Sequence, residues 1–154
     1  MNQHEIFIKQ AYQLAREAVA HGNHPFGALL VKDGAVILTA ENSIYTDHDV
    51  TRHAELNLVS AAAQRFEAET LAQCTLYTST EPCAMCTGAI YWAGIAMVVF
   101  GCSAAALGEI AGGSLAMPCA EILARGKRPT AVIGPILEAE GVQIHQQYWP
   151  SVFG

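Results

Sequence analysis

The stretches His53-Ala54-Glu55 and Pro82-Cys83-Ala84-Met85-Cys86 decide the fold and the chemistry expected of this 154-residue chain. One histidine and two cysteines can hold a zinc ion in three of its four tetrahedral positions, and a catalytic zinc site keeps the fourth for water. The remaining glutamate, two residues after the histidine, can then move the protons of that water. The pattern therefore predicts a catalytic zinc site, with His53, Cys83 and Cys86 as ligands and Glu55 as the acid/base group.

Each half of this pattern, taken alone, also suits a different role. A Cys-x-x-Cys pair can be half of a structural zinc knuckle, a redox dithiol or two buried small side chains. A structural zinc site needs four protein ligands, and Cys102 and Cys119 are too widely spaced to form a second pair of this kind. A redox dithiol would leave His53 and Glu55 without a role, although alone they would suit the start of a helix. The combination favours catalytic zinc.

The composition predicts an apolar, acidic protein that does not bind nucleic acid. Hydrophobic residues make up 52% of the chain and charged residues only 14%, against roughly 25% in an average domain. The net charge is −6, and Arg125, Lys127 and Arg128 form the one small basic cluster, whereas a tight nucleic-acid binder carries a basic face. The small number of charges predicts that further apolar surface is buried in a homodimer.

The chain is expected to be cytoplasmic and not bound to a membrane. Its first residues lack the basic and apolar regions of a secretory signal, and no apolar run approaches the roughly 18 residues that span a bilayer. The sequence has five cysteines, an odd number, and two of them belong to the motif. The other three, Cys74, Cys102 and Cys119, are expected to be reduced, partly buried thiols without disulfides.

Apolar spacing predicts helices and strands that alternate along one domain of residues 1–154. The expected helices are 4–20, 51–63 with Thr51 as its cap, 83–93, 118–125 and a weak helix 138–149 interrupted by Gly141. The expected strands are 26–31, 35–40, 75–79, 95–100 and 130–133, the first two joined by an Asp33-Gly34 turn. Residues 101–118 have no clear period and are expected to be mostly an irregular loop. This order predicts an α/β fold with helices on both faces of the sheet.

These motifs make the chain similar to the cytidine deaminase-like superfamily, and within it to small bacterial guanine deaminases and tRNA adenosine deaminases. The likeness runs from Pro25-Phe26-Gly27-Ala28 through the two motifs to Phe100-Gly101. It implies a three-layer α/β/α sandwich with a mixed five-stranded sheet, usually a homodimer or larger assembly, and hydrolytic loss of ammonia from an amino-substituted ring. It also implies that Glu55 takes a proton from the zinc-bound water, passes it to a ring nitrogen and protonates the leaving amine.

The resemblance also points to residues that bind the substrate. Asn42 matches the asparagine that hydrogen-bonds the base in this family, and its alternative role is to end the hairpin. Phe26 can stack on the ring, and its alternative is core packing at the start of a strand. Backbone N–H groups around Ala54 and Cys83 are candidate donors to the charge that develops during attack.

Two aromatic side chains complete the set of substrate-binding candidates. Phe153 belongs to an aromatic C-terminus, with Tyr148 and Trp149, that helps close a site in the guanine deaminase branch, often across a dimer. Trp92 is the second, and its alternative is a position in the core or in the dimer interface. The C-terminal segment is therefore expected to matter for the choice of substrate.

Guanine or a related aminopurine is the predicted substrate, in a role in purine metabolism. The Pro-Phe-Gly-Ala stretch, the run Ile90-Tyr91-Trp92-Ala93 and the aromatic C-terminus resemble the guanine deaminase branch. Where that branch tends to carry acidic residues, however, this chain has Gly112-Gly113-Ser114-Leu115, which is closer to the tRNA adenosine deaminases, and Arg52 replaces a small residue. Glu109 is the acidic residue that could compensate, and its alternative is a solvated position in a loop.

Three alternatives stay open beside the aminopurine prediction. They are a tRNA adenosine (A-to-I) deaminase, a cytosine or cytidine-type deaminase, and a zinc-binding module without activity. The acidic net charge opposes the first, because tRNA is a polyanion. The intact Glu55 opposes the last.

Overall fold

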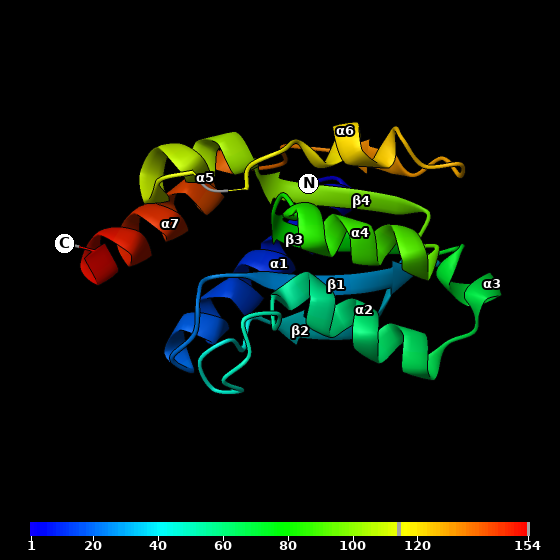
Figure 1. Ribbon diagram of the computed structural model, residues 1–154, viewed down its shortest axis with the longest axis horizontal. Helices are drawn as coiled ribbons and strands as arrows, with labels where there is room; N and C mark the ends of the chain where they lie inside the picture. The colour runs from blue at the N-terminus through cyan, green and yellow to red at the C-terminus, as the bar shows by residue number, and fades with distance from the viewer. Residues whose placement is uncertain (114, 154) are drawn as a thin grey trace.

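The structure is a computed structural model that describes residues 1–113 and 115–153, with side chains through Trp149. A mixed five-stranded sheet forms its centre, and helices lie on both faces of the sheet (Figure 1). The strands are β1 (Gly27–Lys32), β2 (Ala35–Glu41), β3 (Thr75–Thr80), β4 (Met97–Cys102) and β5 (Ala131–Ile133). The helices are α1 (Gln3–Ala20), α2 (Ala54–Arg65), α3 (Ala68–Leu71), α4 (Ala84–Ala93), α5 (Ala104–Ala111), α6 (Cys119–Leu123) and α7 (Glu138–Phe153). The predicted three-layer α/β/α fold with a mixed five-stranded sheet is confirmed.

The strand order is β2-β1-β3-β4-β5, and the directions of the strands bring several loops to one edge. β1 is antiparallel to both β2 and β3, whereas β3, β4 and β5 are parallel to one another. The carboxyl ends of β2, β3 and β4 therefore lie at the same edge of the sheet as the beginning of β1. The predicted hairpin is present, with Asp33 and Gly34 in the left-handed region at φ 51° and 75°.

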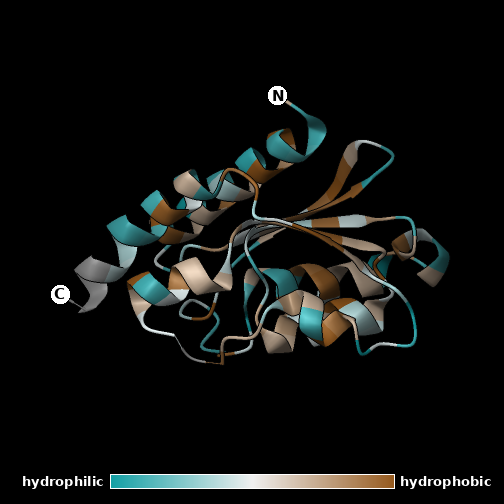
Figure 2. Ribbon diagram, turned by 90° about the horizontal axis from the view of Figure 1, so that it is seen from above, coloured by the Kyte–Doolittle hydropathy of each residue, from teal (hydrophilic) through white to brown (hydrophobic). Residues whose placement is uncertain are grey.

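Each face of the sheet has its own hydrophobic core, because successive side chains of a strand point to opposite faces. Leu30 and Leu76 face α2 and α4 and pack with Leu58 and Ile90. Their neighbours Leu29 and Tyr77 face α1 and α7 and pack with residues such as Ile8, Tyr12 and Ile144. Figure 2 shows the sheet between these two helical layers, with hydrophobic colouring along the strands. Burial on both faces explains why β1 and β4 have apolar runs instead of strict alternation.

Some predicted elements differ from the structure, and local contacts explain two of these differences. The helix after the 42–51 segment begins at Ala54, with His53 as its N-cap, because the hydroxyl of Thr51 donates to Asp49 Oδ1 (2.6 Å) instead of capping the helix. Residues 104–111 form α5, not an irregular loop, because the Ser103 side chain caps this segment by accepting from Ala106 N–H. The short helix α3 was not expected.

The terminal helix α7 also differs from its prediction, because it continues through Gly141 without a break. A Cβ atom at this position would lie 2.8 Å from both Cys102 Cβ and the hydroxyl of Tyr12. The glycine therefore allows α7 to approach the sheet closely at this point. This close approach places the end of α7 beside the site described below.

The remaining expectations for the whole chain have mixed outcomes. No helix in the described part of the chain is long and apolar enough to span a bilayer. All five cysteines are free thiols, and Cys74, Cys102 and Cys119 are buried. The single domain of residues 1–154 and the cytoplasmic location stay predictions.

Candidate active site

The predicted zinc ligands lie at the N-termini of two neighbouring helices, at the edge where β3 ends. His53 is the N-cap of α2, Cys83 is the N-cap of α4, and Cys86 lies in the first turn of α4. The chain passes from the last residue of β3 to Cys83 through Glu81 and Pro82, so the parallel crossover from β3 to β4 fixes where α4 begins. The crevice outside the carboxyl ends of strands is the usual place for a ligand in an open α/β sheet.

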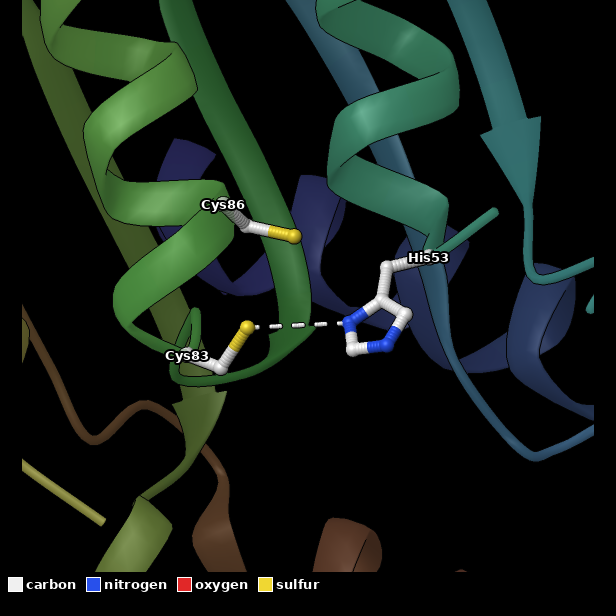
Figure 3. Close-up of side chains that lie close together, drawn as sticks. All are labelled: His53, Cys83 and Cys86. Carbon is white, nitrogen blue, oxygen red and sulfur yellow. Dashed lines mark hydrogen bonds between the residues drawn. The ribbon is translucent and has the colours of Figure 1, made fainter. Parts of the chain in front are cut away.

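Three side chains converge there with a spacing that suits zinc. Figure 3 shows His53, Cys83 and Cys86 with their nitrogen and sulfur atoms turned toward one another. One ligand atom from each residue lies within 4.8 Å of the other two, and His53 Nδ1 is 3.6 Å from Cys83 Sγ. Zinc–nitrogen and zinc–sulfur bonds of about 2.0 and 2.3 Å at a tetrahedral angle would separate two such atoms by about 3.5 Å. The donor set and its geometry therefore fit a zinc ion with one position left for water.

The electrostatics of the two thiols favour metal binding at Cys83. Hydrogen bonds from the Cys86 thiol and from His53 lower the pKa of Cys83 to about 4, although its partial burial opposes this shift. Cys83 is therefore a thiolate at neutral pH, and the thiolate is the form that binds zinc. The pKa of the Cys86 thiol is raised, first by its hydrogen bond to Cys83 and then by burial, so this thiol must release a proton when a metal binds.

Glu55 lies in the first turn of α2 beside these ligands and outside the ligand set. It is 4% exposed, and it lines the cavity described next. Burial is the main reason that the pKa of its carboxyl rises to about 7. A carboxyl group with a pKa near the working pH can both accept and return a proton, which is what general acid–base catalysis requires.

A cavity of about 340 Å³ opens onto His53, Cys83 and Glu55. Asn42 and Phe26 both lie on its wall, as predicted for substrate-binding residues. The Asn42 side chain is buried, and its Oδ1 atom accepts from the backbone N–H of Ile44 (3.1 Å), which fixes the orientation of the amide. The side-chain NH₂ group has no partner among the described residues. The amide is thus free to donate to a ligand in the cavity.

Glu81 is a site residue that the sequence reasoning missed. Its two carboxylate oxygens accept from the N–H groups of Ala104 (3.0 Å) and Cys119 (2.8 Å), which begin α5 and α6. One side chain therefore holds both ends of the segment that covers the cavity. The signal was present in the sequence, because an acidic residue directly before the Pro-Cys motif can reach the N–H groups of nearby helix starts.

The covering side of the cavity is mostly apolar and comes from two parts of the chain. α5 contributes residues such as Leu107. Leu115 and Met117 follow α5 along the chain, and Trp149 comes from α7. We call α5, Leu115, Met117 and Trp149 the cap. Trp149 reaches the cavity of its own chain, and its ring lies 4.9 Å from that of His24, another residue of the wall. Figure 1 shows α5 and α7 side by side at this end of the molecule.

Of the other predicted substrate-binding residues, Ala54 and Trp92 lie away from the cavity. Ala54 is fully buried in the core between α2 and the sheet, and it does not line the cavity. Trp92 is 84% exposed on α4 and does not line the cavity either. Phe153 falls outside the described side chains. Of the five predicted contacts, Asn42 and Phe26 are therefore the two that the structure places on the cavity wall.

Three protein ligands that leave a zinc position for water, with a buried carboxylate beside them, form the arrangement of the zinc-dependent deaminases. A comparison with family models leads to the same class, since residues 1–102 match the cytidine and deoxycytidylate deaminase zinc-binding region. The chain belongs to this family and is a zinc-binding, hydrolytic deaminase.

Its relatives share deamination and differ in substrate. A probable cytosine deaminase from Schizosaccharomyces pombe is 35% identical over 93% of this chain and 90% of its own. A guanine deaminase from Bacillus subtilis is 50% identical over 58% of each chain. A tRNA-specific adenosine deaminase from Aquifex aeolicus is 38% identical over 62% of this chain and 64% of its own. The last two matches therefore span less than two thirds of those proteins.

Solved structures support the same fold and family. The crystal structure of the protein NE0047 in complex with 2,6-diaminopurine has a TM-score of 0.81 to this chain at 25% identity. The match covers 98% of this chain and 83% of that protein.

Proposed function

We propose that the protein removes the amino group of guanine or a related aminopurine by hydrolysis. The observation that carries this proposal is that a buried Asn42 amide and the ring of Phe26 line the same cavity as Glu55. An aromatic ring offers a stacking surface for a flat base, and an amide can pair with the edge of a heterocycle. The 50% identity to a guanine deaminase and the diaminopurine bound by NE0047 support a purine base.

Zinc held by His53, Cys83 and Cys86 would supply a water activated for attack at neutral pH. Glu55 accepts the proton of the attacking water, because its buried carboxyl is ionised in part near pH 7. Glu55 then delivers this proton to a ring nitrogen. As the C–N bond breaks, Glu55 passes the proton of the newly bound hydroxyl to the departing amine, so that a carbonyl group forms and ammonia leaves as a neutral molecule. Asn42 holds the base by hydrogen bonding, and the cap keeps bulk water away from the ring.

Ammonia release from a panel of bases tests the proposal. Zinc-loaded protein is incubated with guanine, 2,6-diaminopurine, adenine, cytosine and their nucleosides, and with a tRNA that is read for inosine. We expect guanine or diaminopurine to have the highest kcat/KM. Equal absence of ammonia from all purine bases, with zinc bound, would overturn the proposal.

A cytosine-type deaminase is the second candidate. The alignment with the probable cytosine deaminase is the observation that favours it, because it extends over 93% of this chain whereas the guanine deaminase alignment stops at 58%. Cytosine in the same panel distinguishes the two proposals. The net charge of −6 opposes a substrate as anionic as tRNA.

We also propose a homodimer in the cytoplasm. Trp92 leaves 84% of its surface exposed on α4, and the indole of a monomeric protein is seldom exposed to this extent. The three buried thiols outside the motif suit a reducing compartment. Light scattering coupled to gel filtration tests the assembly, and Trp92→Glu should then shift the mass toward that of one chain.

A further inference from the structure

A buried histidine on α7 connects the cap to the end of β3. His145 is 1% exposed, its Nδ1 lies 3.0 Å from the indole nitrogen of Trp149, and its Nε2 lies 2.8 Å from the hydroxyl oxygen of Thr80. Thr80 and Trp149 both line the cavity, whereas His145 lies behind them. The proposed chemistry uses neither of these two hydrogen bonds.

The indole of Trp149 determines where His145 carries its proton. An indole N–H can only donate, so Nδ1 of His145 must be the acceptor in this hydrogen bond. Burial lowers the pKa of His145 to about 4, so the ring is neutral at pH 7 and its one proton resides on Nε2. The Nε2–H group therefore donates to Thr80, and the oxygen of Thr80 is the acceptor.

This direction leaves the hydroxyl hydrogen of Thr80 without an acceptor in the described part of the chain. The Thr80 side chain is 3% exposed, and its hydroxyl has no other hydrogen-bond partner among the described residues. A buried hydroxyl hydrogen without an acceptor is costly, which means that a bound molecule with an acceptor at this place would gain from it. The oxygen keeps a second lone pair, but its one hydrogen has no acceptor among the described residues, so an acceptor atom at this place gains more than a donor does.

We propose that Thr80 is a specificity-determining residue that donates a hydrogen bond to an acceptor atom of the substrate ring, and that His145 is its positioning residue. The acceptor is a ring nitrogen or an exocyclic carbonyl oxygen of the base. A base with N–H or C–H at the same place leaves the donor unpaired and is rejected. This inference rests on the proposed function, because it names which feature of an aminopurine the cavity reads.

Pairs of bases that differ by one acceptor test the proposal. The panel is guanine, 7-deazaguanine, 3-deazaguanine and 2-aminopurine, of which the last three each lack one acceptor of guanine. Wild-type protein is compared with Thr80→Val, which keeps the shape and removes the hydroxyl, with Thr80→Ser, which keeps the hydroxyl, and with His145→Gln. Zinc content and melting temperature are measured for each, because valine also leaves His145 Nε2–H unpaired.

We expect Thr80→Val to lower kcat/KM for guanine by about tenfold or more, and to leave unchanged the kcat/KM of the one analogue that lacks the acceptor read by Thr80. Thr80→Ser should restore the wild-type pattern, and His145→Gln should weaken the same discrimination. A purely structural effect of Thr80→Val would lower the kcat/KM of all four bases by one common factor, and that result would overturn the role of Thr80. If wild-type protein neither binds nor deaminates any of the four, the aminopurine function itself fails and the proposal for Thr80 fails with it.

Discussion

The zinc site and the cap enclose the same cavity and are built in opposite ways. The zinc site places four polar residues, His53, Glu55, Cys83 and Cys86, at the starts of two helices that the sheet holds in position. The cap presents mostly apolar side chains from α5 and α7, and a single carboxylate, that of Glu81, holds both ends of the segment that includes α5. The zinc site has the metal ligands and the acid/base group for the reaction, and the cap has an apolar surface against which a ring can pack.

The difference explains why relatives of this chain can share chemistry and differ in substrate. Residues 1–102 match the family model and contain every zinc-site residue, whereas α5 and α7 lie beyond that range. A change in the cap alters the shape offered to the ring and leaves the ligands and Glu55 in place. The reaction and the choice of substrate can therefore be separated by mutation.

Removing a zinc ligand should have the largest effect. Cys86→Ser replaces a thiolate ligand by a weak one, and we expect zinc loss together with a fall in kcat of more than about 10³-fold. Zinc is measured by mass spectrometry and turnover by ammonia release. The matched control is Cys74→Ser, a buried cysteine at the opposite end of β3, which should retain zinc and activity. Full zinc occupancy in Cys86→Ser would contradict the ligand assignment.

Glu55→Gln should separate metal binding from proton transfer. The amide is the same size but cannot accept and return a proton, so kcat should fall by about 10²- to 10⁴-fold while zinc stays bound. Glu109→Gln, an exposed glutamate on α5, is the control and should behave as wild type. Turnover near the wild-type rate in Glu55→Gln would exclude the acid/base role.

Glu81→Gln should loosen the cap and leave the zinc site intact. Each carboxylate oxygen accepts one backbone N–H, and a neutral amide can accept at only one of the two places. We expect the free energy of unfolding to fall by about 3 kcal/mol and the amides of Ala104 and Cys119 to exchange faster with deuterium. Glu121→Gln on α6 is the exposed control. Unchanged exchange at both amides would show that Glu81 does not hold this segment.

The smallest expected effect is the dependence of stability on pH that His145 causes. Its pKa is about 4 in the folded protein and about 6.5 when unfolded, so the unfolded chain binds the proton first as the pH falls. The contribution is complete above pH 6.5 and is lost as the pH falls toward 4, and the loss should amount to about 2 kcal/mol at pH 5. Urea unfolding at pH 7 and 5 should show this loss in wild type and in His21→Gln, and not in His145→Gln. The same loss in all three proteins would assign it to other groups.

Much of the zinc site could be predicted from the sequence, because its residues lie close together in two short motifs. The helix start at Cys83 follows from a local signal, the proline before it. The fold could be predicted for the same reason, since hydrophobic runs and turns mark the five strands. The helix cap predicted at Thr51 was wrong because the Thr51 hydroxyl bonds the neighbouring Asp49 instead. The break predicted at Gly141 was wrong because the glycine lets α7 pack closely on the sheet.

The cap could not be predicted in this way, because it depends on contacts between distant segments. Residues 101–118 are rich in glycine, alanine and serine and as a whole have no clear apolar period, yet residues 104–111 within them form a helix whose start is held by Glu81. His145 and Thr80 are 65 positions apart, and no sequence pattern connects them. Trp92 is of a residue type that suits a substrate contact, and the sequence alone could not show that it lies exposed on α4, away from the cavity.

The central claim is that the zinc site performs the reaction and that the cap contributes to the choice of ring without taking part in the chemistry. The most direct test is the ratio of kcat/KM for guanine to that for cytosine in wild type and in Trp149→Ala, with zinc content measured in both. We predict that the ratio favours guanine in wild type and falls about tenfold or more in the variant, at unchanged zinc content. A ratio that stays the same, with both substrates slowed equally, would contradict the claim.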